Sequence, residues 1–231
     1  MAYDIGVIGA MEGEVAALIS RLSDREERLV SGIRFYSGSL LGKSCVICKC
    51  GIGKVFAAIA AEAMILNFAP RIVVNTGVGG AIDKELKPLD IVFASELCQH
   101  DMDTSPLGDP KGLVSGINRI FFEADERAVG LLSAIAAERG IGYKVGRIAS
   151  GDRFIATGDE KSRISHDFGA LACEMEGASI AQVAFVNGTP FAVVRAISDS
   201  ADGDASMDYM EFLPKAEEIS TELTLALIER Y

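Results

Sequence analysis

Hydrophobic and polar positions follow two patterns along the chain. Short, continuous apolar runs, typical of strands that are buried on both faces, are separated by longer stretches whose apolar residues recur at helical spacing. The predicted strands are 4–8, 34–39, 44–49, 71–75, 90–94, 144–149 and 190–197. The predicted helices are 12–22, 54–66, 123–139, 178–187 and 217–230. Strands that alternate with helices in this way predict an α/β protein with a largely parallel core sheet.

The chain shows no internal repeat, low-complexity tract or linker that would divide it. We therefore predict a single domain over residues 1–231. The loosest part is 98–113, where aspartate, glycine and proline gather. This part is predicted to be a long surface excursion, and long ordered loops are often functional.

Composition narrows the classes of partner. The 231 residues include 22 basic and 33 acidic side chains, which gives a formal net charge of −11. With 49% hydrophobic and 24% charged residues, the composition is that of an ordinary globular protein. Nucleic acids and anionic membranes favour basic surfaces, so neither is an expected partner. Every apolar stretch ends before the roughly 18 residues that a membrane helix needs.

Five cysteines and two histidines are the obvious candidates for metal ligands. The odd cysteine count and a start without a secretory signal predict a reduced, cytoplasmic protein. Cys45, Cys48 and Cys50 lie close together, but no second pair completes four ligands, so we predict core cysteines and no metal. His100 stands beside aspartates and is the better candidate for a ligand contact, whereas His166 is predicted to lie at the surface.

Carboxylates follow several of the predicted strands, where ligands bind in open α/β sheets. Glu14, Glu176 and Asp199 are far apart in sequence, and their convergence would form an acidic pocket. Each also has a purely structural explanation. Glu14 falls in a first helical turn, where the helix dipole favours a carboxylate by ~0.3–1 kcal/mol. Glu174 and Glu176 fit the solvent-facing edge of a strand, and Asp199 fits a helix N-cap or a turn.

Other catalytic motifs are missing from the sequence. The glycine segments 51–54 and 77–80 lack the spacing of a Walker motif and of the dinucleotide fingerprint. No Gly-x-Ser-x-Gly elbow is present, and no cysteine has a histidine in a supporting motif. A nucleoside triphosphate, a dinucleotide cofactor and serine or cysteine hydrolase chemistry are therefore not expected.

Six segments in one order resemble a known family. They are 9–14 (GAMEGE), 51–54 (GIGK), 75–77 (NTG), 150–152 (SGD), 174–176 (EME) and 195–199 (RAISD). Together they resemble the methylthioadenosine/S-adenosylhomocysteine nucleosidases of the purine nucleoside phosphorylase superfamily, over nearly the whole chain. The resemblance implies a nucleoside phosphorylase-like fold with a mixed, mostly parallel central sheet flanked by helices. It also implies hydrolysis of the N-glycosidic bond of adenine thionucleosides without a cofactor.

The resemblance assigns a role to each carboxylate. Asp199, helped by Ser198, would protonate the purine, and Glu14 would orient the attacking water. Glu176, next to Met175, would hold the ribose hydroxyls. The other substrate-binding residues that the resemblance implies are Ala10, Met11, Ile52, Val78, Gly79, Phe154, Ile155, Glu174, Arg195 and Tyr209. Among these, Phe154 would stack on the purine, and Glu174 and Arg195 would support the pocket.

The chemistry of glycosidic cleavage agrees with these roles. The transition state resembles an oxocarbenium ion, whose positive charge a carboxylate pocket stabilises. Asp199 must carry a proton to act as the acid, so we expect a partly desolvated site that raises its pKa. Val78 stands where many relatives carry a serine, and no arginine lies in the adjacent turns. These two departures favour water over phosphate as the nucleophile.

Three functions remain open at this stage. The first is a nucleosidase for methylthioadenosine, S-adenosylhomocysteine or both. The second is a related enzyme, either an aminodeoxyfutalosine or other purine nucleosidase or a nucleoside phosphorylase. The third is a non-catalytic nucleoside sensor on the same fold. The resemblance further implies a homodimer whose 98–113 excursion reaches a neighbouring pocket, the alternative being a mobile surface loop.

Overall fold

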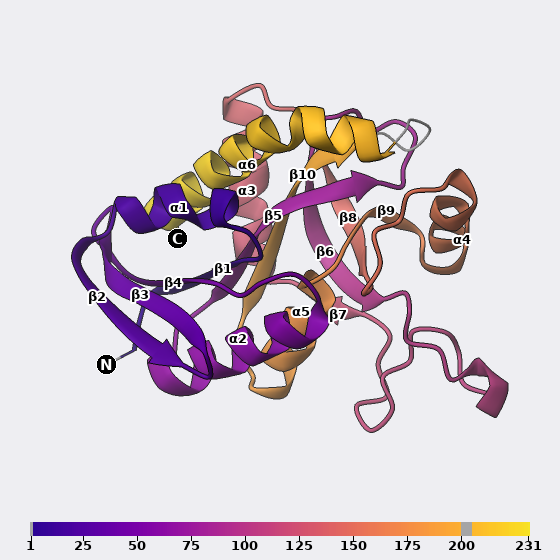
Figure 1. Ribbon diagram of the computed structural model, residues 1–231, viewed down its shortest axis with the longest axis horizontal. Helices are drawn as coiled ribbons and strands as arrows, with labels where there is room; N and C mark the ends of the chain where they lie inside the picture. Colours follow the sequence, from indigo (N-terminus) through magenta and orange to yellow (C-terminus); the bar gives the residue numbers. More distant parts are fainter. Residues whose placement is uncertain (1, 200–204) are drawn as a thin grey trace.

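A mixed β-sheet forms the centre of the computed structural model, which describes residues 2–199 and 205–231 (Figure 1). Its strands are β1 (Ile5–Gly9), β2 (Ser23–Val30), β3 (Ile33–Leu40), β4 (Lys43–Lys49), β5 (Val73–Ala81), β6 (Ile91–Gln99), β7 (Phe122–Glu123), β8 (Tyr143–Ser150), β9 (Ala170–Glu174) and β10 (Phe191–Asp199). The helices are α1 (Glu12–Ser20), α2 (Lys54–Phe68), α3 (Glu126–Glu138), α4 (Gly158–Phe168), α5 (Gly177–Val186) and α6 (Ala205–Arg230), with a short 3₁₀ turn at Ser105–Leu107.

Part of the sheet closes on itself. The strand order is β10-β6-β8-β9-β5-β1-β4-β3-β2, and β10 also pairs with β5, so five strands form a ring. Pairing is parallel between β1 and β4, β1 and β5, β5 and β10, β6 and β8, and β8 and β9. Antiparallel pairing joins β10 to β6, β5 to β9 and the meander of β2, β3 and β4. The predicted α/β fold with a mixed sheet is confirmed.

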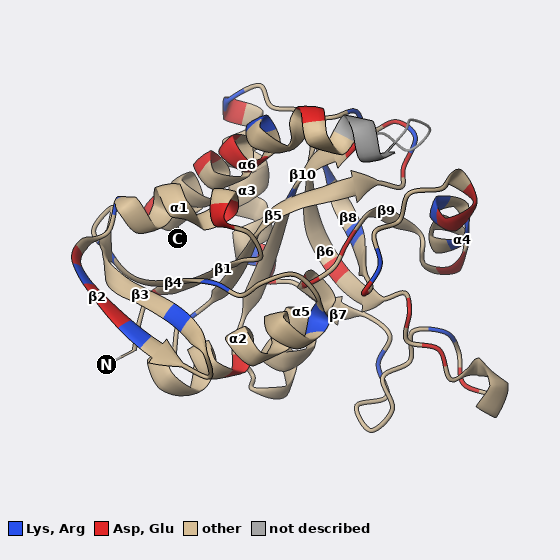
Figure 2. Cartoon of the chain, viewed as in Figure 1, with Lys and Arg blue, Asp and Glu red and all other residues tan. Residues whose placement is uncertain are grey.

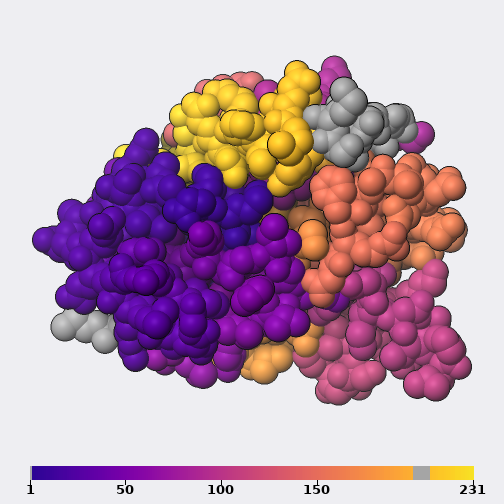
Figure 3. Space-filling model, in the orientation of Figure 1, coloured from indigo at the N-terminus to yellow at the C-terminus, as the bar shows by residue number. Residues whose placement is uncertain are grey.

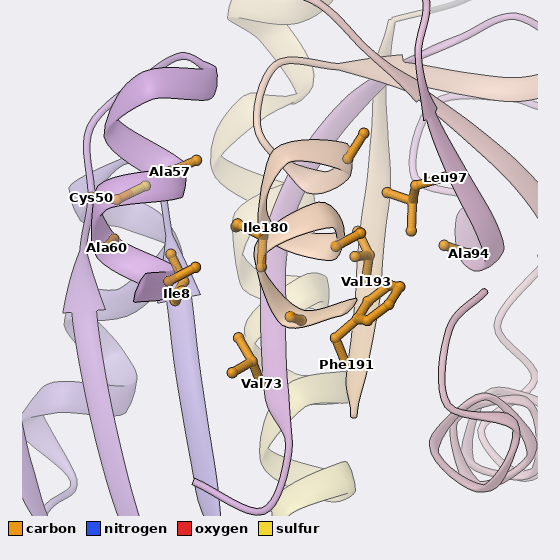
Figure 4. Packing of buried hydrophobic residues seen from close by; sticks show 14 of the residues in the cluster. Ile8, Cys50, Ala57, Ala60, Val73, Ala94, Leu97, Ile180, Phe191 and Val193 are labelled. Atoms are coloured by element: carbon orange, nitrogen blue, oxygen red, sulfur yellow. The ribbon is translucent and has the colours of Figure 1, made fainter. Parts of the chain in front are cut away.

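Helices cover both faces of the sheet, and each face has its own hydrophobic core. Helices α1, α3 and α6 lie on one side, and α2 and α5 lie on the other (Figure 1). On β1, Val7 packs in the core beneath α1, α3 and α6, whereas Ile8 packs in the core beneath α2 and α5, because successive side chains of a strand point to opposite faces. Figure 4 shows Ile8 near Ala57 and Ala60 of α2. Strands buried on both faces explain the continuous apolar runs of the sequence.

Several elements differ from the sequence prediction. Strand β2 was not predicted because it is an edge strand whose polar residues are nearly all exposed, so it lacks an alternating pattern. Strand β5 does not end at Asn75 but continues through the glycines to Ala81. Helix α6 begins at Ala205 and contains Pro214, well before the predicted start at Glu217. Helix α4 was also not predicted, because most of its residues are polar.

The predicted surface excursion begins within β6, which includes Cys98 and Gln99. The rest is loop apart from the 3₁₀ turn, and it projects from the sheet (Figure 1). Figure 3 places this part of the chain at one corner of the face it shows. Leu107 at its tip is 84% exposed, which confirms a surface loop.

Charged side chains gather on outer elements of the fold, whereas the cysteines are buried. Acidic and basic residues mix on outer elements such as β2 and α4 (Figure 2). All five cysteines are free and buried, and burial raises the pKa of Cys45 and of Cys98 to about 12. Within 2–199 and 205–231, no group of three or more histidine, cysteine, aspartate or glutamate side chains could hold a metal ion. No helix in the same ranges is long and apolar enough to cross a membrane.

Candidate active site

The ends of β1, β5, β9 and β10 surround one pocket. Gly80 of β5 pairs with Asp199 of β10 on one side and with Cys173 of β9 on the other. The cavity measures about 180 Å³. Its lining residues are Ala10, Met11, Glu14, Ile52, Val78, Gly79, Gly80, Arg153, Phe154, Ile155, Cys173, Glu174, Met175, Glu176, Ser198, Asp199 and Tyr209. The three predicted carboxylates therefore converge.

Glu14 reaches the pocket from the first turn of α1. Its Oε2 accepts hydrogen bonds from the backbone N–H groups of Ala10 (2.6 Å) and Met11 (2.9 Å). Its Oε1 accepts a third from the N–H of Val78 (3.3 Å). Glu14 is only 3% exposed, and this burial raises the pKa of its carboxyl, although Arg195 and the N–H groups act against the shift. The helix dipole alone does not account for a carboxylate this deeply buried.

The pKa values of Glu174 and Glu176 are shifted in opposite directions although the two residues are close in sequence. The Oε2 of Glu174 accepts from the N–H of Gly177 (2.8 Å) and pairs with the guanidinium of Arg195, and its Oε1 accepts from the hydroxyl of Ser150. Burial opposes its ionisation, but Arg195 and Ser150 outweigh burial and lower the pKa of Glu174.

For Glu176, burial and then the charge of Glu174 raise the pKa to about 7. Its Oε1 accepts a hydrogen bond from the N–H of Gly53 (2.9 Å), just before α2. Both carboxylates are buried, so the solvent-facing explanation is wrong.

Asp199 ends β10 and is 2% exposed. The hydroxyl of Ser198 donates to its Oδ1 (3.1 Å), and the ammonium of Lys161 donates to its Oδ2 (2.8 Å). The predicted desolvation is confirmed. The rise in the pKa of Asp199 expected from the sequence stays a prediction. Burial favours such a rise, whereas the ammonium of Lys161 opposes it because a nearby positive charge favours the ionised carboxylate.

Aromatic and apolar side chains form the open edge of the pocket. Phe154 and Tyr209 meet edge to face, with ring centroids 5.6 Å apart. The hydroxyl of Tyr209 donates to the Sδ of Met11 (3.5 Å). Phe154 is 48% exposed and Ile52 is 56% exposed, so both remain accessible to a ligand.

Two predicted contacts need correction. Arg195 does not line the cavity as a substrate-binding residue; it lies behind the cavity, 1% exposed, and holds Glu174 and Asn75, which fits the supporting role that the resemblance implied. His100 does not line the cavity either, and its ring lies against Gly151 instead. His166 is 88% exposed, as predicted.

Sequence pattern did not single out Gly80, Arg153 and Cys173, which line the cavity, or Lys161, which pairs with Asp199. Gly80 belongs to the glycine segment 77–80, and Arg153 and Cys173 adjoin the segments 150–152 and 174–176, so proximity was the available signal. For Lys161 the only signal was a capping pattern, Thr157 with Glu160, that begins α4.

The comparisons with known proteins agree with this geometry. The profile of the phosphorylase superfamily matches residues 4–229. A 5′-methylthioadenosine/S-adenosylhomocysteine nucleosidase of Actinobacillus succinogenes is 41% identical over 225 residues, which cover 97% of both chains. A mutant of the nucleosidase of Helicobacter pylori, solved with 5′-methylthioadenosine in the active site, superposes with a TM-score of 0.95 at 35% identity and full coverage of both chains. A structure described as futalosine hydrolase of Helicobacter pylori gives a TM-score of 0.94 at 35% identity, covering 100% of this chain and 99% of the other.

Proposed function

The chain belongs to the phosphorylase superfamily, and we propose that it acts as a 5′-methylthioadenosine/S-adenosylhomocysteine nucleosidase. The enzyme hydrolyses the N-glycosidic bond of adenine thionucleosides and releases adenine. The observation that carries this proposal is the convergence of Glu14, Glu176 and Asp199 on one cavity. Relatives that are 41% identical and bear this name support it.

Each carboxylate has one task in the proposed mechanism. Asp199 gives a proton to the purine, so that adenine leaves as a neutral base. Glu176 accepts hydrogen bonds from the ribose hydroxyls, and its charge stabilises the positive ribose ring. Glu14, fixed by the N–H groups of Ala10 and Met11, orients water toward the anomeric carbon and takes its proton. Phe154, with Tyr209 at its edge, stacks on the base.

Water, and not phosphate, is the proposed nucleophile, because the carboxylate of Glu14 lies where a bound phosphate would have to lie. Its carboxylate uses the N–H groups of Ala10, Met11 and Val78, which are donors that a phosphate would need. A phosphate beside this buried carboxylate would also be repelled by its charge. Val78 supplies no hydroxyl to offset that repulsion.

Chromatographic detection of adenine from a nucleoside panel, with and without phosphate, tests the proposal. We expect adenine and a free thioribose from methylthioadenosine or S-adenosylhomocysteine, at a rate independent of phosphate. Phosphate dependence would indicate a phosphorylase, and absence of turnover would indicate a sensor. Aminodeoxyfutalosine belongs in the panel, because the Helicobacter pylori structure described as futalosine hydrolase is among the close structural neighbours.

Two isosteric substitutions test the catalytic roles. Asp199→Asn removes the proton donor, and Glu14→Gln removes the base that directs water. We expect each variant to keep the fold and to lose more than about nine-tenths of adenine release. Activity above about a tenth of wild type in either variant would remove that residue from the mechanism.

We also propose a homodimer in the cytoplasm. Support for the dimer comes from exposed apolar side chains on and beside α2, among them Val55 (69% exposed), Phe56 (55%) and Leu66 (67%). Ile52 belongs to the same surface and to the pocket, so a second copy seated there would lie next to the substrate. Five free, buried cysteines support a reducing compartment. Light scattering tests the dimer: a mass near the 24.5 kDa of one chain would contradict it.

A further inference from the structure

The ammonium of Lys161 is buried at the base end of the pocket. Its side chain is 3% exposed, and its Nζ lies 2.8 Å from Oδ2 of Asp199, which is itself 2% exposed. Lysine is almost never buried to this degree without a charged partner. The other residues of α4 are mostly polar and exposed, so the burial of Lys161 is a specific feature of this helix.

Groups from four elements face this ion pair. Ser198 of β10 donates to Oδ1 of Asp199, and the thiol of Cys173 on β9 is close enough to be affected by the charges of both Asp199 and Lys161. The phenol of Tyr209 on α6 is close enough for its pKa to respond to Asp199. Glu160, the neighbour of Lys161 on α4, is held by Arg153 at 2.5 Å.

These neighbours differ in charge. The Glu160–Arg153 pair is balanced, and burial keeps the Cys173 thiol neutral by raising its pKa to about 12. Glu174 is neutralised by Arg195. Lys161 therefore places a cation in direct contact with the carboxylate of Asp199.

We propose that Lys161 is a positioning residue that stabilises the carboxylate left on Asp199 after it has given its proton to the purine. This inference rests on the proposed role of Asp199 as the acid. In the step, the O–H bond of Asp199 breaks, an N–H bond forms on the purine, and the electron pair of the glycosidic bond moves into the base. The negative charge that remains on Asp199 lies against the ammonium of Lys161. Asp199 takes up a proton from solvent again when the next substrate binds, so the ligand-free enzyme holds the carboxylate.

Replacing Lys161 by methionine removes the charge and keeps the length of the side chain. Without the ammonium, Asp199 holds its proton more tightly and gives it up less readily. We therefore expect kcat to fall by about tenfold or more. Loss of the ammonium should raise the pKa of Asp199 by about one to three units, because a nearby opposite charge lowers a carboxyl pKa by that amount. The alkaline limb of kcat/KM, which reports the free enzyme, should move to higher pH by the same amount. Lys161→Arg keeps the charge and should restore the wild-type profile.

Lys215→Met is the matched control. Lys215 pairs with Glu218 on the exposed face of α6, outside the pocket, so this variant should keep the wild-type kcat and pH profile. A lower kcat for Lys161→Met with an unshifted profile would overturn the proposal, because a merely structural role lowers activity without moving the limb. A failure of the proposed function is distinguishable, since the wild type itself would then release no adenine.

A spectroscopic test does not depend on the folding of Lys161→Met. The infrared difference between the wild type and Asp199→Asn, both without ligand at neutral pH, isolates the carboxyl of Asp199. Carboxylate bands are expected, because the ion pair favours the ionised form. The carbonyl stretch of a protonated acid in their place would overturn the inference.

Discussion

The partners of two neighbouring carboxyl groups in this site shift their pKa values in opposite directions. Arg195 and Ser150 keep Glu174 ionised, and the resulting charge, together with burial, raises the pKa of Glu176 to about 7. Glu176 is therefore partly protonated near neutral pH in the empty enzyme. It must be ionised to accept hydrogen bonds from both ribose hydroxyls.

Ligand binding should consequently release a proton from Glu176. Near pH 7 we expect a fractional proton release when a non-hydrolysable thionucleoside analogue binds, and the release should vanish above about pH 8–9, where Glu176 is already ionised. Calorimetry in buffers of different ionisation enthalpy measures it. Glu176→Gln should bind more weakly and release no proton at this site. An equal release by both proteins would contradict the assignment.

The same residue predicts a trend in stability. A carboxyl whose pKa is raised on folding stabilises the protein below its unfolded pKa, and this contribution is lost as the pH rises through the folded pKa. For Glu176 the window runs from the ordinary value of 4.5 to about 7. The free energy of unfolding of the wild type should therefore fall relative to Glu176→Gln across this window. Denaturant titrations at several pH values measure the difference, and parallel curves would refute it.

The sequence allowed prediction of these carboxylates but not of Lys161. The carboxylates stand in short ordered segments that resemble one family. Lys161 stands in a mostly polar helix that was not predicted, although it shares the buried face of this helix with Ile164 and Phe168. Its contact with Asp199 depends on how α4 packs against β8 and β9, which is a long-range property that local pattern does not encode.

Among the elements, β5 carries glycines where two carboxylates of the site approach its backbone. A Cβ atom at Gly77 would lie 2.5 Å from Oε1 of Glu14, and one at Gly80 would lie 3.0 Å from Oδ1 of Asp199. The strand thus lacks side chains where two carboxylates approach its backbone. From sequence alone, the glycines of 77–80 predict the end of the strand at Asn75, because glycine usually weakens strands.

Gly77→Ala should therefore displace the carboxylate of Glu14 and lower kcat by about tenfold or more. Gly130→Ala is the control, because this glycine lies within α3 and an added Cβ meets no atom within 4 Å. Alanine there should leave adenine release unchanged and stabilise the protein by up to ~1 kcal/mol. Adenine release and denaturant unfolding of both variants test the pair. Wild-type turnover by Gly77→Ala would show that Glu14 need not be held in place.

A buried hydroxyl cluster ties α6 to β5. Ser220 accepts a hydrogen bond from the N–H of Gly77 (3.1 Å) and lies 2.6 Å from the hydroxyl of Thr76, to which Thr224 also donates (2.9 Å). Ser220→Ala leaves the N–H of Gly77 without this acceptor and should cost about 1–3 kcal/mol of unfolding free energy. Denaturant unfolding measures the loss. A change within experimental error would show that the strand tolerates the missing bond.

At the scale of the whole molecule, the ring of strands determines which residues meet. Gly80, Cys173 and Asp199 come together because β5 pairs with both β9 and β10. Sequence pattern predicts the individual strands, but pairing between segments far apart in the chain depends on closure of the sheet. The convergence of three carboxylates could be proposed from the strand ends, whereas the register that brings them together could not.

The proposed dimer should be sensitive to a charge placed in its apolar surface on α2. If the exposed apolar surface on α2 packs against a second copy, a charge at Val55 would be buried there at a high free-energy cost. Val55→Glu should then lower the mass measured by light scattering from twice 24.5 kDa to 24.5 kDa. Leu41→Glu is the matched control, because Leu41 is 53% exposed in the turn between β3 and β4 and lies beside Arg21 and Glu222, on the side of the sheet opposite α2. Because Ile52 belongs to both this surface and the pocket, the monomer should also release adenine more slowly, with the loss mainly in KM. A wild type that is already monomeric, or an equal effect of both substitutions, would place the partner surface elsewhere.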